Sequence, residues 1–210
     1  MSANPLGDRR PSELRQRELV DAALHLIATE GITALTTRRL ADAVGLSSGA
    51  IFRHFPTLDD LLGAVVAQVE VVLDATYPPA ALPPMTRLER FIAARAHAVG
   101  AQLGILRLVL SEQFLLSLPA DGAARLTACV VRTRRFIEQC LRDGQAAGEV
   151  RADLAPEALA PIVMGTVSAL ALVPDRGRRR EADARATKDA LLLLLSLPAA
   201  APALRRTRTR

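Results

Sequence analysis

The sequence is poor in several residue types, and each shortage excludes a class of protein. It has two cysteines, no tryptophan and only 3% aromatic residues. Two cysteines in 210 residues cannot form the disulfide framework of a small secreted domain. The longest apolar runs fall far short of the roughly 20 residues that span a bilayer. The start of the chain lacks the apolar core of a signal peptide. We therefore expect a cytoplasmic globular protein without a membrane partner.

Lysine is also scarce, since Lys188 is the only one among 27 basic residues. The net charge of +5 owes most to residues 199–210, where four arginines stand without an acidic residue. Residues 1–60 hold seven arginines against eight acidic residues. The high pI is thus largely an effect of the tail, and alone it does not indicate nucleic-acid binding. We interpret the arginine excess first as coding bias and only second as phosphate chemistry.

Apolar residues recur with helical spacing along the chain, whereas no stretch alternates with period two for long enough to form a strand. Residues 12–30 carry one such apolar stripe, and Gly31 follows it as a helix-ending glycine. We expect further helices over about 36–44, 48–54, 57–73, 86–100, 103–117, 121–147, 156–173 and 184–197. Pro161 predicts a kink or a later start in its helix. The predicted fold class is all-α.

Breaks in this pattern divide the chain into three parts. We expect a three-helix domain over residues 1–56, a helical body over 57–198, and a disordered arginine-rich tail over 199–210. Cys129 and Cys140 fall on one helix of the body, about 16 Å apart along its axis, so they cannot form a disulfide with each other. Buried thiols are favoured there over redox sensors.

The most informative segment is Thr36 to Phe55, TTRRLADAVGLSSGAIFRHF. Its pattern predicts two short helices joined by a tight turn, with Ser47 capping the second and with Leu40, Val44, Ile51 and Phe55 facing inward. Small residues at the start of the second helix allow its N-terminus, where free N–H groups favour phosphate, to approach a surface closely. This is typical of a helix-turn-helix that lies in the major groove of DNA. The alternative is an ordinary helical hairpin whose small residues merely allow packing.

Over residues 14–62 the sequence resembles the TetR/AcrR-type transcriptional regulators, most strongly in this segment and in the Gly31 break. The resemblance implies that Thr37 and His54 contact phosphates and that Arg38 approaches base edges, where it can read guanine. The residues implied to contact DNA are Thr37, Arg38, Ser47, Ser48, Gly49, Ala50, Phe52, Arg53 and His54.

Two positions depart from the pattern of that family. Phe52 stands where a tyrosine is common, and Leu58 stands where a lysine is common at the start of the next helix. The first change removes a phenolic hydrogen bond to phosphate. The second removes one charge per subunit, which should flatten the salt dependence of DNA binding.

The resemblance further implies a small effector held between the helices of the body. The residues that we expect around it are Phe91, His97, Gln102, Arg107, Gln113 and Phe114. The alternative is that most of the polar ones face solvent. With five Phe, one Tyr and no Trp in the chain, such a pocket would be aliphatic rather than an aromatic cage.

The last two expected helices carry more apolar surface than one chain needs. Leu191 to Leu195 make the final helix apolar all round. We interpret this surface as the two-fold interface of a homodimer, formed by four helices from two chains. The alternative is a buried terminal helix in a monomer.

The sequence thus predicts a homodimeric, ligand-responsive DNA-binding transcriptional regulator. We expect a repressor that a small apolar or amphipathic effector releases from a palindromic operator in double-stranded DNA. The alternative is a DNA-bound structural or division-linked protein whose body binds a protein partner. That alternative would show many dispersed chromosomal sites and no ligand-induced thermal shift.

No enzyme, metal site or cofactor is expected. Gly45 to Gly49 match the G-x-S-x-G nucleophile elbow, but the elbow follows a strand and this segment follows a predicted helix. The three histidines have no partner at helical spacing, which metal ligands usually have. We therefore assign no catalytic or metal-binding residue.

Overall fold

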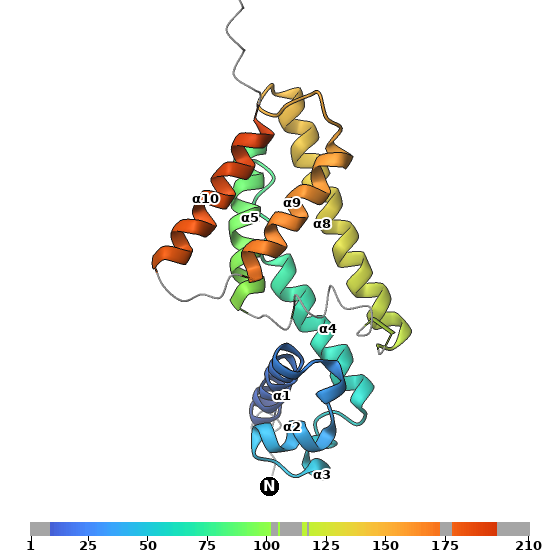
Figure 1. Ribbon diagram of the computed structural model, residues 1–210. Coiled ribbons are helices and arrows are strands. Elements are labelled where there is room, and N and C mark those ends of the chain that lie inside the picture. The colour runs from blue at the N-terminus through green and yellow to red at the C-terminus, as the bar shows by residue number, and fades with distance from the viewer. Residues whose placement is uncertain (1–8, 102–104, 106–114, 117, 173–177, 197–210) are drawn as a thin grey trace, which may run out of the picture.

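The computed structural model describes residues 9–101, 105, 115–116, 118–172 and 178–196. In these residues the regular elements are helices, apart from one isolated β-bridge between Val150 and Ser196. The elements are α1 (Arg9–Glu30), the 3-10 helix η1 (Ile32–Ala34), α2 (Thr37–Val44), α3 (Ser48–Ile51), α4 (Leu58–Asp74), α5 (Pro84–Ala101), α8 (Ala120–Ala146), α9 (Pro156–Leu172) and α10 (Arg178–Leu195) (Figure 1). The predicted all-α class is confirmed.

The described chain has a small head and a larger body, which α4 joins. We call α1, η1, α2 and α3 the head, and α5, α8, α9 and α10 the body. In Figure 1, α3 lies at the tip of the head, at the opposite end of the molecule from the loop between α8 and α9. In the head, α1 packs on α2 and α4, and in the body α5, α8 and α9 pack on one another.

Polar side chains at the caps fix where the helices of the head begin. Thr36 accepts a hydrogen bond from the Arg39 N–H at 3.2 Å, which caps α2. Ser47 accepts one from the Ala50 N–H at 3.2 Å, which caps α3. Gly45 ends α2 with φ 67°, a left-handed conformation that favours glycine. The turn between the two helices is therefore specified by residues within it.

The second short helix is shorter than the predicted span 48–54. It ends at Ile51, and the chain continues as a turn in which the His54 N–H bonds to the Ile51 carbonyl at 2.9 Å. The Gln16 side chain on α1 donates to the His54 carbonyl at 3.0 Å. This hydrogen bond ties the turn after α3 to α1.

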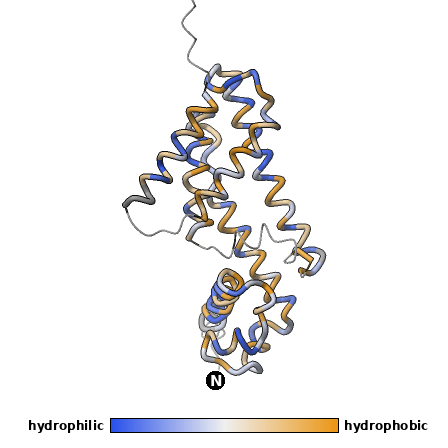
Figure 2. The backbone as a smooth tube through the Cα atoms, in the orientation of Figure 1, coloured by the Kyte–Doolittle hydropathy of each residue, from blue (hydrophilic) through white to orange (hydrophobic). Residues whose placement is uncertain are grey.

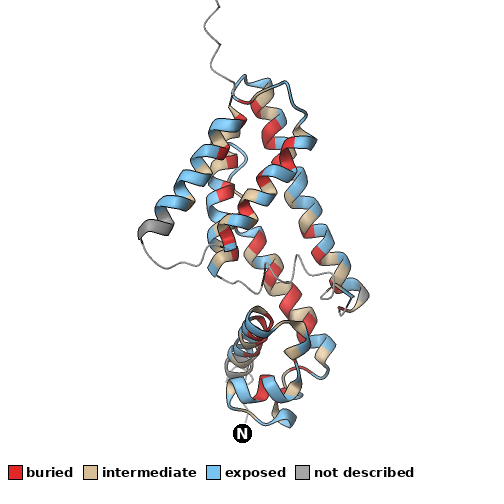
Figure 3. Cartoon of the chain, viewed as in Figure 1, coloured by how far each residue is buried: buried red, intermediate tan, exposed pale blue. Residues whose placement is uncertain are grey.

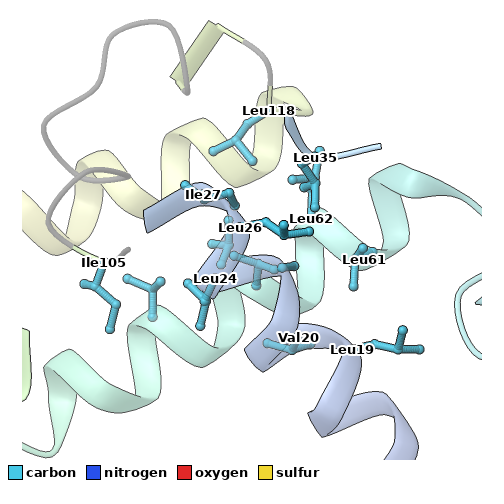
Figure 4. Close-up of a cluster of buried hydrophobic side chains, with 14 of the residues drawn as sticks. Leu19, Val20, Leu24, Leu26, Ile27, Leu35, Leu61, Leu62, Ile105 and Leu118 are labelled. Carbon is cyan, nitrogen blue, oxygen red and sulfur yellow. The ribbon is translucent and has the colours of Figure 1, made fainter. Parts of the chain in front are cut away.

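The apolar core runs from the head into α4. Leu61 and Leu62 of α4 lie in the same buried cluster as Leu19 and Ile27 of α1 (Figure 4). Thr57 and Asp60 form a capping box that begins α4, with the Asp60 N–H donating to Thr57 Oγ1 at 3.0 Å. The expected boundary after residue 56 thus coincides with a helix start, but the core continues across it.

The body has a second core, in which Leu88, Phe91, Ile137 and Val163 are fully or almost fully buried. Buried residues follow the faces where α5, α8 and α9 meet, whereas α10 is largely exposed (Figure 3). Apolar residues gather toward the C-terminal end of α10 (Figure 2). None of the described helices combines the length and the apolar character of a membrane span.

Ion pairs join the helices of the body and α4. Lys188 of α10 pairs with Glu89 of α5 at 2.6 Å. Arg125 of α8 pairs with Glu70 of α4, and this hydrogen bond lowers the pKa of the Glu70 carboxyl. Cross-helix pairs of this kind fix the register of neighbouring helices more than they add stability.

Besides the early end of α3, two further predictions of helix bounds differ from the structure. The final helix begins at Arg178, earlier than the predicted 184. The predicted later start at Pro161 is wrong, because α9 begins at Pro156 and continues through Pro161, which is exposed. Most of the predicted helix 103–117 and the whole tail 199–210 lie outside the described residues. Cys129 and Cys140 are buried and free, as expected.

Candidate functional site: the helix-turn-helix surface and the body cavity

The nine residues predicted to contact DNA all lie at the surface of the head. Six of them are exposed, and Thr37, Ala50 and His54 are half-buried. The residues predicted to face inward from the same two helices do so, since Leu40, Ile51 and Phe55 are buried and Val44 is half-buried. The segment therefore separates one buried face from one exposed face, as a helix-turn-helix requires.

The arginines of this surface differ in whether a carboxylate holds them. Arg39 is paired with Glu30 at the end of α1. Arg38 and Arg53 are exposed, and neither forms an ion pair within the described part of the chain. The guanidinium groups of Arg38 and Arg53 are thus free to bind an acceptor on another molecule, whereas that of Arg39 is paired within the head.

His54 is held in place from α1. Its Nδ1 lies 3.5 Å from Ser12 Oγ, and its carbonyl accepts the Gln16 hydrogen bond described above. These contacts fix the turn that follows α3. Phe52, at the end of α3, keeps 45% of its surface exposed and presents an apolar ring at the tip of the head.

A cavity of about 140 Å³ lies in the body, bounded by α4, α5, α8 and α9. Its lining residues are Leu73, Phe91, Arg95, Val99, Ile105, Cys129, Val130, Thr133, Ile137, Met164, Val167, Ser168 and Ala171. The wall is mainly aliphatic, and Phe91 is its only aromatic residue among those described. Leu73 brings α4, the helix that comes from the head, into contact with this space.

The structure places only part of the predicted effector site at this cavity. Phe91 lines it, but His97 is exposed on α5 and is not among the lining residues. For His97 the alternative of a solvent-facing side chain therefore holds, because its position on α5 points away from the buried stripe. The other predicted residues, Gln102, Arg107, Gln113 and Phe114, lie outside the described residues.

Arg95 was not predicted, yet it is the most unusual residue of the cavity. Only 4% of its surface is exposed. Its guanidinium carbon lies 5.1 Å from the ring centroid of Tyr77 and 4.9 Å from that of Phe91. Burial lowers the pKa of Arg95, and the nearby Tyr77 opposes that shift. One signal pointed to it in the sequence: Arg95 follows Phe91 by four residues on the apolar stripe of its helix.

The head and the body together define an all-helical helix-turn-helix protein. Residues 19–65 match the model of a family described as "Bacterial regulatory proteins, tetR family". The stretch from α1 into α4 thus matches a domain of the TetR family.

Curated relatives match only a part of the chain. It is 33% identical over 66 residues to the HTH-type transcriptional repressor KstR2 of Rhodococcus jostii. It is 37% identical over 60 residues to the nucleoid occlusion factor SlmA of Haemophilus ducreyi. The matches cover 31% and 28% of this chain, and the chain spans only 32% and 30% of the length of those relatives.

Solved structures match the fold over most of the chain. The ketosteroid transcriptional regulator KstR2 of Mycobacterium tuberculosis has a TM-score of 0.77 at 20% identity, covering 88% of this chain and 96% of that one. AibR, solved in complex with isovaleryl coenzyme A and operator DNA, has a TM-score of 0.69 at 17% identity, covering 88% and 100%. The likeness extends through head and body alike, and it concerns the fold.

Proposed function

We propose that this protein is a homodimeric, ligand-responsive transcriptional regulator, which represses by binding a palindromic operator through its two heads. The observation that carries the proposal is the exposed face of α2 and α3, where Arg38 and Arg53 lack a carboxylate partner among the described residues. The similar AibR fold has been solved with operator DNA, and the similar KstR2 is a transcriptional repressor.

The surface of the head suits the major groove. With α3 in the groove, Arg38 approaches base edges, where a guanidinium binds guanine O6 and N7 with two hydrogen bonds. Phe52 offers an apolar contact, of the kind that a thymine methyl group accepts. Thr37 and His54, at the two flanks, are placed to donate to phosphates. In a dimer, two such heads bind half-sites about 34 Å apart, one helical turn of DNA.

A second copy of the chain would cover the exposed apolar residues of α9 and α10. Leu193 is 77% exposed and Leu194 is 65% exposed, while Ile162 and Leu172 are each more than half exposed. The alternative of a buried terminal helix in a monomer fits less well, because among residues 182–195 of α10, whose burial is described, only Leu191 and Leu195 are buried. Exposed apolar surface of this extent is typical of an interface between proteins.

The cavity and the head are connected through α4. This helix starts at the Thr57 cap beside the head and reaches the cavity with Leu73. A ligand in the cavity therefore acts on the helix that sets the position of the head. It can release DNA only to the extent that it prefers the conformer whose head spacing does not fit the operator.

Selection of sheared genomic DNA from the source organism tests this function, using purified protein at about 150 mM salt, where weak phosphate-only binding is screened. We expect a few sites that share an inverted repeat. Arg38→Ala should weaken binding to such a site by about 1–3 kcal/mol and relax the preference at one base pair. Arg39→Ala is the matched control, because Arg39 is paired with Glu30. Recovery of DNA without any shared sequence would refute the operator-binding function.

A second candidate function is that of a DNA-bound, division-linked protein whose body binds a protein partner. It is favoured by the partial similarity to nucleoid occlusion factors. The same selection distinguishes the two, because this candidate predicts many dispersed chromosomal sites. It also predicts that no small molecule raises the melting temperature of the protein.

A further inference from the structure

The body cavity combines apolar walls with one buried cation. Arg95 is the only charged residue among those described around it. Its Nε and Nη2 atoms are buried and have no hydrogen-bond partner within the described part of the chain. An ionised group that is buried without a partner destabilises a protein substantially, so such a group calls for an explanation.

The free atoms of Arg95 lie next to each other on the guanidinium. The N–H groups of Nε and Nη2 lie in the plane of the guanidinium and point outward from one edge, side by side. This arrangement can hold both oxygens of a carboxylate. Tyr77 and Phe91 stabilise the cation through their ring faces. A ring face does not accept a hydrogen bond in the plane of the guanidinium, so these two N–H groups are left without an in-plane acceptor in the described residues.

The other arginines nearby are already engaged. Arg132 pairs with Asp74 at 3.1 Å and Arg125 pairs with Glu70. Arg87 pairs with Asp143. Among the described residues no carboxylate pairs with Arg95. Arg87 Nε is also buried without a hydrogen-bond partner, but the guanidinium of Arg87 still pairs with a carboxylate, whereas that of Arg95 does not.

The remaining polar groups of the wall are occupied by neighbours. Thr133 Oγ1 lies 3.2 Å from the Tyr77 hydroxyl, and the Ser168 hydroxyl donates to the Met164 carbonyl at 3.1 Å. Burial raises the pKa of the Cys129 thiol, which keeps it neutral. Arg95 is thus the group that decides the charge of a ligand.

We propose that this cavity binds a compact apolar monocarboxylate, with the carboxylate on Nε and Nη2 of Arg95 and the hydrocarbon against Val99, Ile137 and Val167. The proposal rests on the proposed function, because it names the class of effector for the same cavity. Its volume of about 140 Å³ limits the size. An engineered apolar cavity of roughly 150 Å³ holds benzene, so we expect a ligand of about six to nine non-hydrogen atoms.

Matched pairs of acids and amides test the charge preference on the full-length protein without DNA. We would titrate benzoate against benzamide and hexanoate against hexanamide, near neutral pH, by calorimetry and by thermal shift. Both carboxylates should raise the melting temperature. Each should bind at least about 10-fold more tightly than its amide, since a charged bidentate acceptor is replaced by a neutral one.

Variants of Arg95 test the residue itself. Arg95→Met should weaken carboxylate binding about 10- to 100-fold and leave amide binding unchanged. Arg95→Lys should give an intermediate affinity, because it keeps the charge but loses the paired N–H edge. Arg90→Met on the exposed face of the same helix is the control, and should bind like the unaltered protein.

Three results would overturn the proposal. They are equal affinity for acid and amide, unchanged carboxylate binding by Arg95→Met, and no binding of either acid up to about 10 mM. The acid and amide comparison needs no variant, so it stands even if Arg95→Met fails to fold. If the protein selects an operator but binds no carboxylate, only this inference is refuted. If it binds carboxylates but selects no operator, only the proposed function is refuted.

Discussion

Gly144 of α8 and Val150 of the following loop approach so closely that a Cβ at Gly144 would lie 2.6 Å from Val150 Cγ2. Val150 is almost fully buried, and its neighbour Arg151 donates its N–H to the Leu195 carbonyl at 2.9 Å. The absence of a side chain at Gly144 therefore allows the loop to fold back onto α8 and to hold the end of α10.

Gly144→Ala should destabilise the protein by about 1–3 kcal/mol, because the short, buried Val150 side chain cannot move away without shifting backbone. Chemical denaturation measures the change. Gly63→Ala on α4 is the control, since nothing lies within 4 Å of its added Cβ. It should stabilise the helix by about 0.5–1 kcal/mol. Equal changes in the free energy of unfolding at the two positions would show that the contact with Val150 does not affect stability.

Thr57→Ala should weaken the start of α4. It removes the hydroxyl that accepts the Asp60 N–H and so opens the capping box. The expected loss is about 1 kcal/mol in the free energy of unfolding. Thr57→Ser should retain most of the stability, because it keeps the capping oxygen. A loss as large for serine as for alanine would assign the effect to the methyl group instead.

Phe52→Tyr should strengthen operator binding, once an operator is known. The side chain is already 45% exposed, so the added hydroxyl costs no packing and can donate to a phosphate. We expect an affinity gain of about 2- to 10-fold, which corresponds to the net contribution of one typical hydrogen bond. Electrophoretic mobility shift or fluorescence anisotropy measures it. An unchanged affinity would place Phe52 away from the DNA backbone.

Asp143→Asn should destabilise the protein at neutral pH and lose this effect in acid. The hydrogen bond from Arg87 holds the pKa of the Asp143 carboxyl below its ordinary value of 3.8. Its contribution to stability is therefore present above that ordinary value and is lost as the pH falls through the lower, folded-state pKa. Because the carboxyl is partly exposed, we expect the variant to lose no more than about 1 kcal/mol in the free energy of unfolding at neutral pH. Denaturation curves at several pH values should show the variant and the unaltered protein converging at low pH.

The starts of α2, α3 and α4 could be predicted from the sequence because each depends on neighbours in the chain. Thr36, Ser47 and Thr57 all accept from an N–H three residues later, so the residues that specify these caps stand together in the sequence. The inward set of α2 and α3 was also predicted, since its spacing follows the helical period. Capping residues that are close in sequence were sufficient to predict the helix starts, and helical periodicity was sufficient to predict the inward-facing residues.

The cavity could not be predicted in the same way, because helices far apart in the sequence form it. Arg95 is buried by Tyr77 and Phe91 and by residues of α8 and α9, and its place four residues after Phe91 is the one local signal of this burial. His97, two residues later, is equally polar and lies in solvent. The hydrogen bond from Gln16 to the turn after α3 likewise joins residues that are 38 positions apart.

The continuous core between α1 and α4 bears on how the protein unfolds and on how it can be dissected. A fragment that ends at residue 56 would lack Leu61, Leu62 and Val65, which complete the buried surface around α1. The same cluster reaches Leu126 on α8, so head and body share one set of apolar contacts. The helix-turn-helix is thus no excisable module, and we expect it to unfold together with α4.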